Sequence, residues 1–208
     1  MRICDIIIWG DNMIVVFGGA FNPVTNAHIE VYQYVMRKFG DCKFIFLPVS
    51  SAYTKSDLAS NYHRVNMLAL ATRKYENVDI SELEISDSDF LGTYQSLIRI
   101  SDNYNDEVAF VVGADNLVSM DRWINVEGIL SEFKIIVLGR NDINPKEMIQ
   151  KNPVLKKFES SFIIFEDFNI DVSSTAFRNT FNKKLLPKEV FRYIIDNELY
   201  RGEEDVQE

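Results

Sequence analysis

The chain has 208 residues, of which 47% are hydrophobic and 12% aromatic, so intrinsic disorder is excluded as its general state. A single domain of this length buries a core without disulfides or a structural metal. The formal net charge of −9 argues against non-specific binding to nucleic acid or to an anionic membrane surface. A small anionic ligand is still allowed, because a few donors in a cleft outweigh the global charge.

The ends of the chain differ from its middle. We interpret residues 1–12 as an extension or a misassigned start, because the first convincing strand begins at Met13. Their longest apolar run, Ile6–Trp9, is far shorter than the roughly 20 residues of a membrane span, and they lack the blocks of a secretory signal. Cys4 and Cys42 have no metal-ligand spacing and are typical of reduced thiols in a cytoplasmic protein. We expect one domain over 13–202 and an acidic tail at 203–208.

Short apolar runs alternate with segments of helical periodicity. The predicted strands are 14–17, 44–47, 78–80, 108–112, 133–138 and 161–165. The predicted helices are 27–39, 62–75, 93–103, 146–151, 174–181 and 187–197, the second capped by Ser60 with Val65, Leu68, Ala69 and Thr72 facing inward. Strands that are apolar on both faces predict an α/β fold, a doubly wound, mostly parallel sheet with helices on both faces. Ligands of such sheets bind at the carboxyl ends of the strands.

A glycine-rich turn lies between the first predicted strand and its helix. It consists of Gly18, Gly19, Ala20 and Phe21. Glycines let backbone N–H groups approach an anion, and the helix N-terminus adds partial positive charge. Thr25 and His28 share one face of the helix start, where a hydroxyl and an imidazole can both donate to phosphate. The alternative is a tight turn with Thr25 as a plain cap and His28 as a packed histidine.

A second hydroxyl-rich helix start lies near the end of the chain. Ser173, Ser174 and Thr175 begin the helix predicted at 174–181. Their hydroxyls converge with free N–H groups, and Arg178, one turn later, carries a fork that suits phosphate. The alternative is simple helix capping.

Further candidates follow other strands. After the strand predicted at 108–112, Gly113 permits close backbone approach, and the Asp115 carboxylate can accept from ribose or base donors. Trp123 can stack on a flat ring. The alternatives are a helix cap and a core tryptophan. Lys55, in the predicted loop 49–59, and Arg64 beyond it can each hold an acceptor phosphate, or can be solvated surface charges.

In this order the motifs resemble those of the nucleotidyltransferase superfamily and, within it, the bacterial nicotinate-nucleotide adenylyltransferases. Thr25-Asn26-Ala27-His28 resembles H/T-x-G-H, Ser173–Arg178 resembles I-S-S-T-x-x-R, and Gly113-Ala114-Asp115 with Trp123 resembles G-A-D…W. Lys55, Arg64 and Met67 fall at the family's H-K loop and R-L-x-M helix, and Thr93-Tyr94 at its S-Y-T segment. The match runs from about Met13 to Tyr200.

The resemblance implies a Rossmann-like nucleotidyltransferase fold and adenylyl transfer from ATP to nicotinate mononucleotide, giving deamido-NAD and pyrophosphate in NAD biosynthesis. It implies catalytic roles for His28, Thr25 and Arg178. It implies ATP binding by Gly18, Gly19, Ala20, Phe21, His28, Gly113, Asp115, Ser173, Ser174, Thr175 and Arg178. It implies acceptor binding by Asn22, Lys55, Arg64, Thr93 and Trp123. Mg²⁺ is expected to arrive with ATP, with no metal site built from the protein.

The sequence departs from the family motifs in three places. Tyr53-Thr54-Lys55 keeps the lysine of the H-K pair but not its histidine. Ala27 stands where the family has glycine, and Asn22 where it has the aspartate of F-D-P. They keep two alternatives open: an adenylyltransferase for another phosphorylated acceptor such as phosphopantetheine, and a degenerate homologue that binds nucleotide as a regulator. The sequence also leaves open the oligomeric state, a homo-oligomer included, and the choice between nicotinate and nicotinamide forms.

Overall fold

The computed structural model describes residues 13–40, 42–50, 58–89, 91–139, 143–168 and 173–200. The predicted extension at 1–12, Cys4 within it, the acidic tail at 203–208 and Lys55 lie outside these residues. Residues 51–57, most of the predicted loop, also lie outside them. Within the described ranges, no helix is long and apolar enough to cross a membrane.

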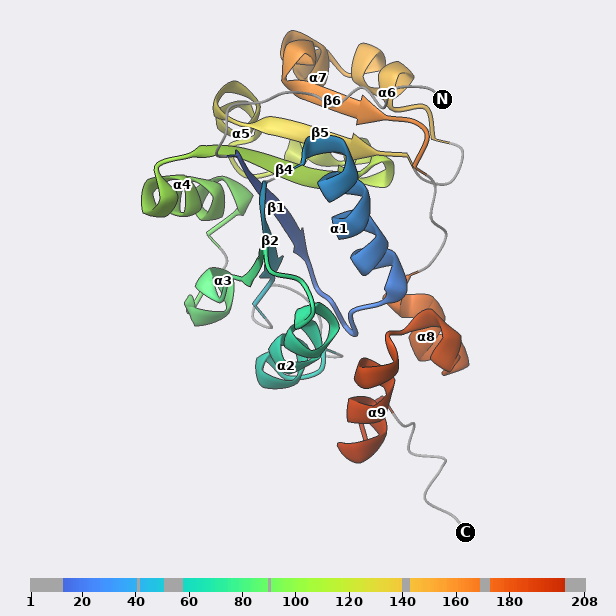
Figure 1. Ribbon diagram of the computed structural model, residues 1–208. Helices are drawn as coiled ribbons and strands as arrows, with labels where there is room; N and C mark the ends of the chain where they lie inside the picture. The colour runs from blue at the N-terminus through green and yellow to red at the C-terminus, as the bar shows by residue number, and fades with distance from the viewer. Residues whose placement is uncertain are drawn as a thin grey trace.

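Six strands of the described chain form one sheet in which neighbouring strands run parallel (Figure 1). They are β1 (Met13–Gly19), β2 (Lys43–Pro48), β3 (Val78–Ile80), β4 (Glu107–Gly113), β5 (Lys134–Leu138) and β6 (Phe162–Phe165). Their order across the sheet is β3-β2-β1-β4-β5-β6. This confirms the predicted doubly wound fold.

Helices connect the strands. They are α1 (Asn26–Phe39), α2 (Asn61–Thr72), α3 (Leu83–Ser86), α4 (Thr93–Tyr104), α5 (Val126–Glu132), α6 (Pro145–Lys151), α7 (Pro153–Lys157), α8 (Ser174–Thr180) and α9 (Lys188–Asp196). Short 3₁₀ turns are η1 (Ala114–Val118), η2 (Met120–Arg122), η3 (Glu159–Ser161) and η4 (Lys183–Leu185). The sequence patterns do not predict α3, α5 or α7, which are too short to show a clear hydrophobic period. The equally short α6 and α8 are predicted from the start signals at Pro145 and Ser173 instead.

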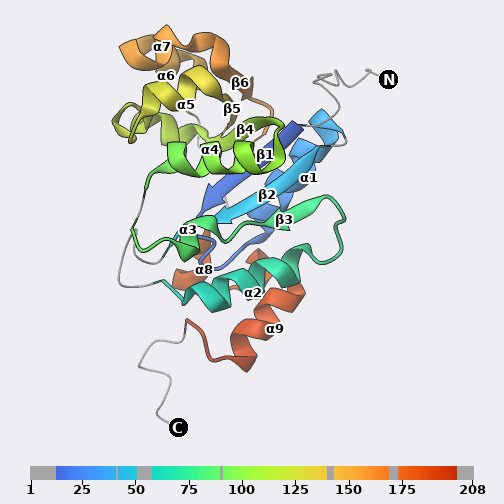
Figure 2. The same ribbon diagram turned by 90° about the vertical axis from the view of Figure 1, so that its left-hand side faces the viewer.

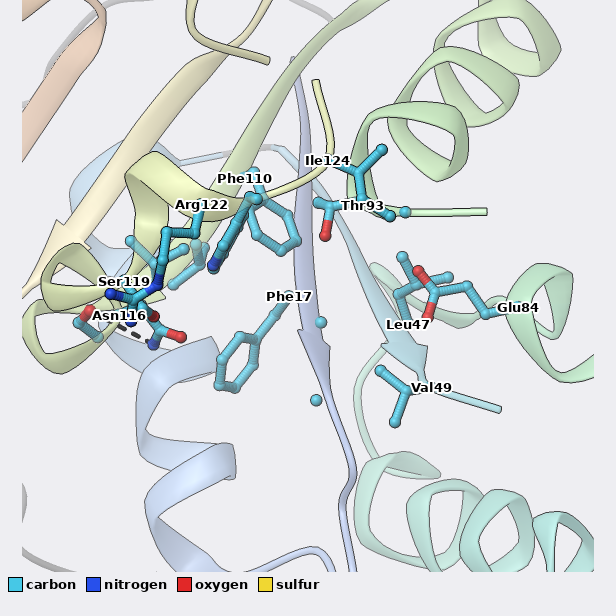
Figure 3. A pocket seen from close by; sticks show the side chains of 17 residues that line it. Phe17, Leu47, Val49, Glu84, Thr93, Phe110, Asn116, Ser119, Arg122 and Ile124 are labelled. Carbon is cyan, nitrogen blue, oxygen red and sulfur yellow. Dashed lines mark hydrogen bonds between the residues drawn. The ribbon is translucent and has the colours of Figure 1, made fainter. Parts of the chain in front are cut away.

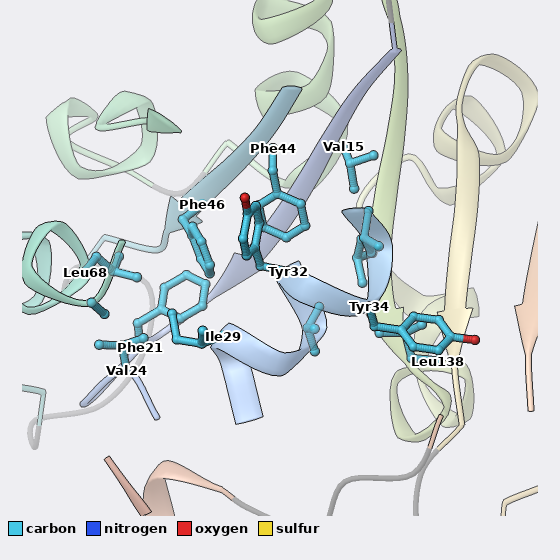
Figure 4. Close-up of a cluster of buried hydrophobic side chains, with 14 of the residues drawn as sticks. Val15, Phe21, Val24, Ile29, Tyr32, Tyr34, Phe44, Phe46, Leu68 and Leu138 are labelled. Carbon is cyan, nitrogen blue, oxygen red and sulfur yellow. The ribbon is translucent and has the colours of Figure 1, made fainter. Parts of the chain in front are cut away.

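The sheet divides the hydrophobic core into two halves, because alternate side chains of a strand point to opposite faces. On one face, Val15, Phe44 and Phe46 belong to a buried cluster that also includes side chains of α1, α2, α8 and α9, part of which Figure 4 shows. On the other, Ile14 and Val16 pack against α4, α5, α6 and α7. Figure 2 shows α1 and α4 on opposite sides of β1 and β2. Burying each such side chain contributes about 1.5–3 kcal/mol.

The order of the strands places the site. From β1 the chain runs outward to β2 and β3, and then crosses back to β4 on the other side of β1. The connections leaving β1 and β4 therefore diverge, and a crevice forms beyond the carboxyl ends of these two strands. The glycine-rich turn at the end of β1 and Gly113 at the end of β4 both lie at this edge.

Candidate active site

A cavity of about 520 Å³ opens at the carboxyl edge of the sheet (Figure 3). Its walls are Phe17, Gly18 and Gly19 of β1, Leu47 and Val49 at the end of β2, Glu84 of α3, Gly92 and Thr93 at the start of α4, Phe110 to Gly113 of β4, and Asn116, Ser119, Arg122, Trp123 and Ile124 beyond β4. This volume lies within the range of small-molecule sites. Of the residues predicted to bind ligand, the cavity brings together Gly18, Gly19, Gly113, Thr93 and Trp123.

The glycine-rich turn is closely packed. A Cβ atom added to Gly18 would lie 3.1 Å from the Phe110 ring, and one added to Gly19 would lie 3.2 Å from the Phe21 ring. Phe21 itself has a left-handed backbone with φ 45° and is buried. This conformation costs free energy in a non-glycine residue, and it directs the Phe21 ring edge-on to His28, with 5.1 Å between ring centroids. The turn therefore supports His28 through the ring of Phe21.

Thr25 is the N-cap of α1 and is fully buried. Its backbone N–H donates to Nδ1 of His28 at 2.9 Å, and its hydroxyl Oγ1 lies 2.9 Å from the same nitrogen. The imidazole is thus held at the first turn of a 14-residue helix, whose amino end attracts anions. Thr25 is a helix cap, as the alternative interpretation held, and the capping also positions His28.

The hydroxyl-rich start of α8 lies beside the start of α1 (Figure 1). Ser173 caps α8, its Oγ accepting from the N–H of Ala176 at 3.1 Å. Ser174 Oγ donates to the carbonyl oxygen of Pro23 at 2.8 Å. Arg178 donates through Nη1 to the carbonyl oxygen of Asn22 at 2.6 Å and through Nη2 to Thr175 Oγ1 at 3.2 Å. Two motifs about 150 residues apart therefore form one cluster of donors.

Arg64 has partners other than the acceptor phosphate predicted for it. Its side chain is fully buried in α2, and its guanidinium donates to the carbonyl oxygens of Ala20 at 2.7 Å, Val49 at 2.6 Å and Ala59 at 3.2 Å. Burial lowers the pKa of Arg64. Arg64 ties the glycine-rich turn to the ends of β2 and of the following loop.

The inward face of α2 also differs from the sequence prediction. Leu68 and Thr72 are buried as predicted, but Ala69 is exposed and Val65 is only partly buried. Arg64, Met67 and Ala71 are buried in their place. The buried face of α2 is therefore rotated relative to the predicted one, and it includes a charged side chain, which hydrophobic periodicity does not count.

Asn22 likewise holds the fold together. It is 2% exposed, and its Oδ1 accepts from the N–H of Ala59 at 3.0 Å and from the hydroxyl of Tyr200 at 2.7 Å. With the bond from Arg178 to its carbonyl, Asn22 joins the glycine-rich turn to the α2 region and to the end of the described chain. These contacts favour a structural role over the acceptor contact predicted for it.

The segment after β4 lies across the crevice from the glycine-rich turn that follows β1. Asp115 belongs to η1, and its Oδ1 occupies the place where a side chain on Gly113 would stand. Trp123 lines the cavity, with its ring 6.2 Å from that of Phe110 at an angle of 73°. Thr93 lines the cavity at the start of α4. Trp123 is therefore held by an edge-to-face contact with Phe110 of β4 while it remains accessible from the cavity.

The sequence interpretation missed four polar residues that line the cavity: Glu84, Asn116, Ser119 and Arg122. Glu84 lies in α3, a four-residue helix with no detectable period. The one sequence signal for it is its position just after the strand predicted at 78–80. Asn116, Ser119 and Arg122 follow β4 closely, and the same rule of carboxyl strand ends would have found them.

Among the described residues, no three His, Cys, Asp or Glu side chains are grouped so as to hold a metal ion. The basic residue that lines the described cavity is Arg122, and the acidic one is Glu84. The start of α1 lies next to this cavity, since Phe17 of the cavity wall has its ring 5.9 Å from that of His28. The arrangement suits a ligand with an anionic phosphate chain and a flat ring.

A doubly wound sheet with phosphate-type donors where its connections diverge is typical of nucleotide-binding proteins. Residues 16–180 match the cytidylyltransferase-like family, so the chain belongs to that family and is a nucleotidyltransferase. A protein of Acholeplasma laidlawii named "Probable nicotinate-nucleotide adenylyltransferase" is 34% identical over 191 residues, covering 90% of this chain and 97% of the relative. A protein of the same name from Clostridium acetobutylicum is 31% identical and covered to 97%. Within the family, the chain belongs to the nicotinate-nucleotide adenylyltransferases.

Solved structures agree with the fold. The nicotinic acid mononucleotide adenylyltransferase of Plasmodium falciparum complexed with NaAD superimposes with a TM-score of 0.72 at 20% identity, covering 91% of this chain and 97% of that one. The same enzyme complexed with APC gives a TM-score of 0.71, covering 90% and 96%. At this identity the likeness concerns the fold.

Proposed function

We propose that this chain transfers the adenylyl group of ATP to nicotinate mononucleotide, forming deamido-NAD and pyrophosphate. The observation that carries the proposal is the joining of the α1 and α8 starts, through Ser174 and Arg178 at Pro23 and Asn22, beside a cavity wide enough for a nucleotide. The relatives that share about 30% identity over nine tenths of the chain support the acceptor.

The reaction needs no protein nucleophile. A phosphate oxygen of nicotinate mononucleotide attacks the α-phosphorus of ATP in line. The new P–O bond forms as the bond to the bridging oxygen of the β-phosphate breaks, and pyrophosphate leaves with that electron pair. Positioning and charge stabilisation therefore supply most of the acceleration.

The donor cluster stabilises the charge that builds up during transfer. In our proposal His28 and the amino end of α1 hold the reacting phosphates, and the buried Thr25 positions the His28 imidazole for this contact. Ser174, Thr175 and Arg178 hold the triphosphate tail and the leaving pyrophosphate, with Ser173 capping their helix. Gly18, Gly19, Ala20 and Phe21 form the turn under the nucleotide, and Gly113 and Asp115 orient it. Mg²⁺ enters as part of the ATP substrate and neutralises phosphate charge.

The acceptor occupies the other part of the cavity. Trp123 stacks on the pyridine ring, and Thr93 at the start of α4 meets the ring substituent, where the amino end of a helix favours an anion. Lys55 remains a proposed phosphate contact outside the described residues. Arg64 and Asn22 contribute by holding the turn and loops, as their buried hydrogen bonds indicate.

Pyrophosphate release from ATP and Mg²⁺ tests the proposal, with nicotinate mononucleotide, nicotinamide mononucleotide and phosphopantetheine compared side by side. Release with a pyridine nucleotide and not with phosphopantetheine is expected. Release with phosphopantetheine alone would replace the acceptor. ATP binding without pyrophosphate release with any of the three acceptors would make the chain a nucleotide-binding regulator. Ala27→Gly and Asn22→Asp, which restore the family residues, would then be the first variants to assay.

A further inference from the structure

Glu84 is a buried carboxyl group in the wall of the cavity. Its side chain is 5% exposed and reaches from α3 toward Leu47 at the end of β2 (Figure 3). Oε1 accepts from the hydroxyl of Ser96 in α4 at 2.7 Å. Oε2 is buried and has no hydrogen-bond partner in the part of the chain that the structure describes. Buried polar atoms are nearly always paired, so an unpaired one beside a ligand cavity indicates a partner on the ligand.

The surroundings of Glu84 favour its neutral form. Burial raises the pKa of this carboxyl group, and the hydroxyl of Ser96 opposes this. Asp87 adds to the rise and Arg99 opposes it, and these two side chains pair with each other at 2.7 Å. A neutral carboxyl donates a hydrogen bond, whereas an ionised one only accepts. The same atom can therefore offer a ligand either a donor or a negative charge.

The position of Glu84 points to the ring end of the acceptor. Figure 3 shows Glu84 and Arg122 on opposite sides of the cavity. Phosphate groups are attracted to Arg122, on the other side of the cavity from Glu84, and to the amino end of α1. The pyridine ring, held between Trp123 and Thr93, is then the part of the acceptor that meets Glu84. This step rests on the proposed function.

We propose that Glu84 is a specificity-determining residue that reads the ring substituent of the pyridine nucleotide. Neutral Glu84 donates from Oε2 to a ring carboxylate and also accommodates a carboxamide. Ionised Glu84 repels the carboxylate and accepts from the carboxamide N–H. The preference of the enzyme for the nicotinate form over the nicotinamide form is therefore highest at low pH and falls as Glu84 ionises.

The test compares kcat/KM for nicotinate mononucleotide and nicotinamide mononucleotide from pH 4.5, the ordinary pKa of a glutamate side chain, up to about pH 9. The ratio of the two kcat/KM values cancels pH effects on ATP and on the acceptor phosphate, which titrates in both nucleotides at about pH 6. In the wild-type protein the ratio should fall by about tenfold or more across this range, the scale of a like-charge contact in a buried site. In Glu84→Gln, which cannot ionise, the ratio should be flat.

Two further variants test whether the effect comes from ionisation of Glu84. Glu82→Gln changes an exposed neighbour in the same segment and should leave the wild-type pH profile. Ser96→Ala removes the hydroxyl that stabilises the ionised form, so the fall in the ratio should move to higher pH. An effect confined to packing would not move that midpoint.

The outcomes separate this inference from the proposed function. Wild-type protein that is active with pyridine nucleotides, with a Glu84→Gln variant that follows the wild-type ratio at every pH, would overturn the role of Glu84 alone. A midpoint that stays in place in Ser96→Ala would also overturn it. Wild-type protein inactive with both nucleotides would overturn the proposed function and this inference together.

Discussion

The backbone N–H of Thr25 donates to Nδ1 of His28 at 2.9 Å. A backbone N–H can only donate, so Nδ1 is the acceptor and the neutral imidazole carries its proton on Nε2. The residue that caps α1 therefore also sets the tautomer of the histidine behind it. A donor at Nε2 is the group that a phosphate oxygen requires.

Replacing His28 with alanine should reduce kcat by about 10²–10³-fold, because one donor to the developing charge is lost. Steady-state rates of pyrophosphate release measure this effect. His63→Ala is the matched control: the other histidine of the chain bonds through Nδ1 to the hydroxyl of Tyr193 at 2.9 Å, between α2 and α9. That variant should keep kcat within a few fold of wild type. Equal rates in the two variants would remove His28 from the phosphate site.

Replacing Arg64 with alanine should lower the free energy of unfolding by about 3 kcal/mol or more, because the carbonyls of Ala20, Val49 and Ala59 lose a charged donor. Urea denaturation measures the loss. Arg73→Ala is the control: its guanidinium meets Glu189 at 3.3 Å on the surface, and its removal should cost less than about 1 kcal/mol. A fully stable Arg64→Ala protein with a raised KM for the acceptor would instead restore the phosphate role predicted from the sequence.

Sequence alone predicts this fold well because the sheet is regular. Each long strand is apolar on both faces and is separated from the next by a helix or loop, a pattern typical of a parallel sheet covered on both faces. Thr25, His28 and Ser174 could be placed together because all follow strands or begin helices at one edge of such a sheet. These residues lie close together because the order of strands and helices brings them to the same edge of the sheet.

Arg64 and Glu84 could not be assigned in this way. Each is a charged residue at a buried position, against the pattern by which periodicity is read. What stabilises Arg64 is a set of carbonyls from residues 20, 49 and 59, and what partners Glu84 is Ser96, twelve residues away on another helix. Only the folded chain brings these partners together.

Trp123→Ala should raise KM for nicotinate mononucleotide more than KM for ATP, by about tenfold, because a stacked ring contributes about 1–3 kcal/mol. Trp123→Phe keeps a flat ring and should recover most of the loss. The exposed tyrosine Tyr62, on α2 and outside the cavity lining, provides the control Tyr62→Ala, with both KM values near wild type. Equal losses for the two substrates in Trp123→Ala would contradict stacking on the acceptor.

The stability of the protein should also report on Glu84. In the unfolded chain this carboxyl group titrates near its ordinary pKa of 4.5, and burial raises its pKa in the folded chain. Between these two values the folded chain binds a proton that the unfolded chain has lost, so the free energy of unfolding decreases as the pH rises. The decrease begins near the ordinary value of 4.5 and is complete above the raised pKa.

Glu84→Gln removes this contribution. The difference in free energy of unfolding between Glu84→Gln and wild type should therefore shift in favour of the variant from about pH 4.5 upward, and urea denaturation at intervals from about pH 4 to pH 8 measures it. Glu82→Gln, at an exposed position in the same segment, controls for the change of net charge and should run parallel to wild type. If the Glu84→Gln curve is also parallel to wild type, the carboxyl group is ionised to the same extent in the folded and unfolded chains, and its burial then carries no energetic consequence for the site.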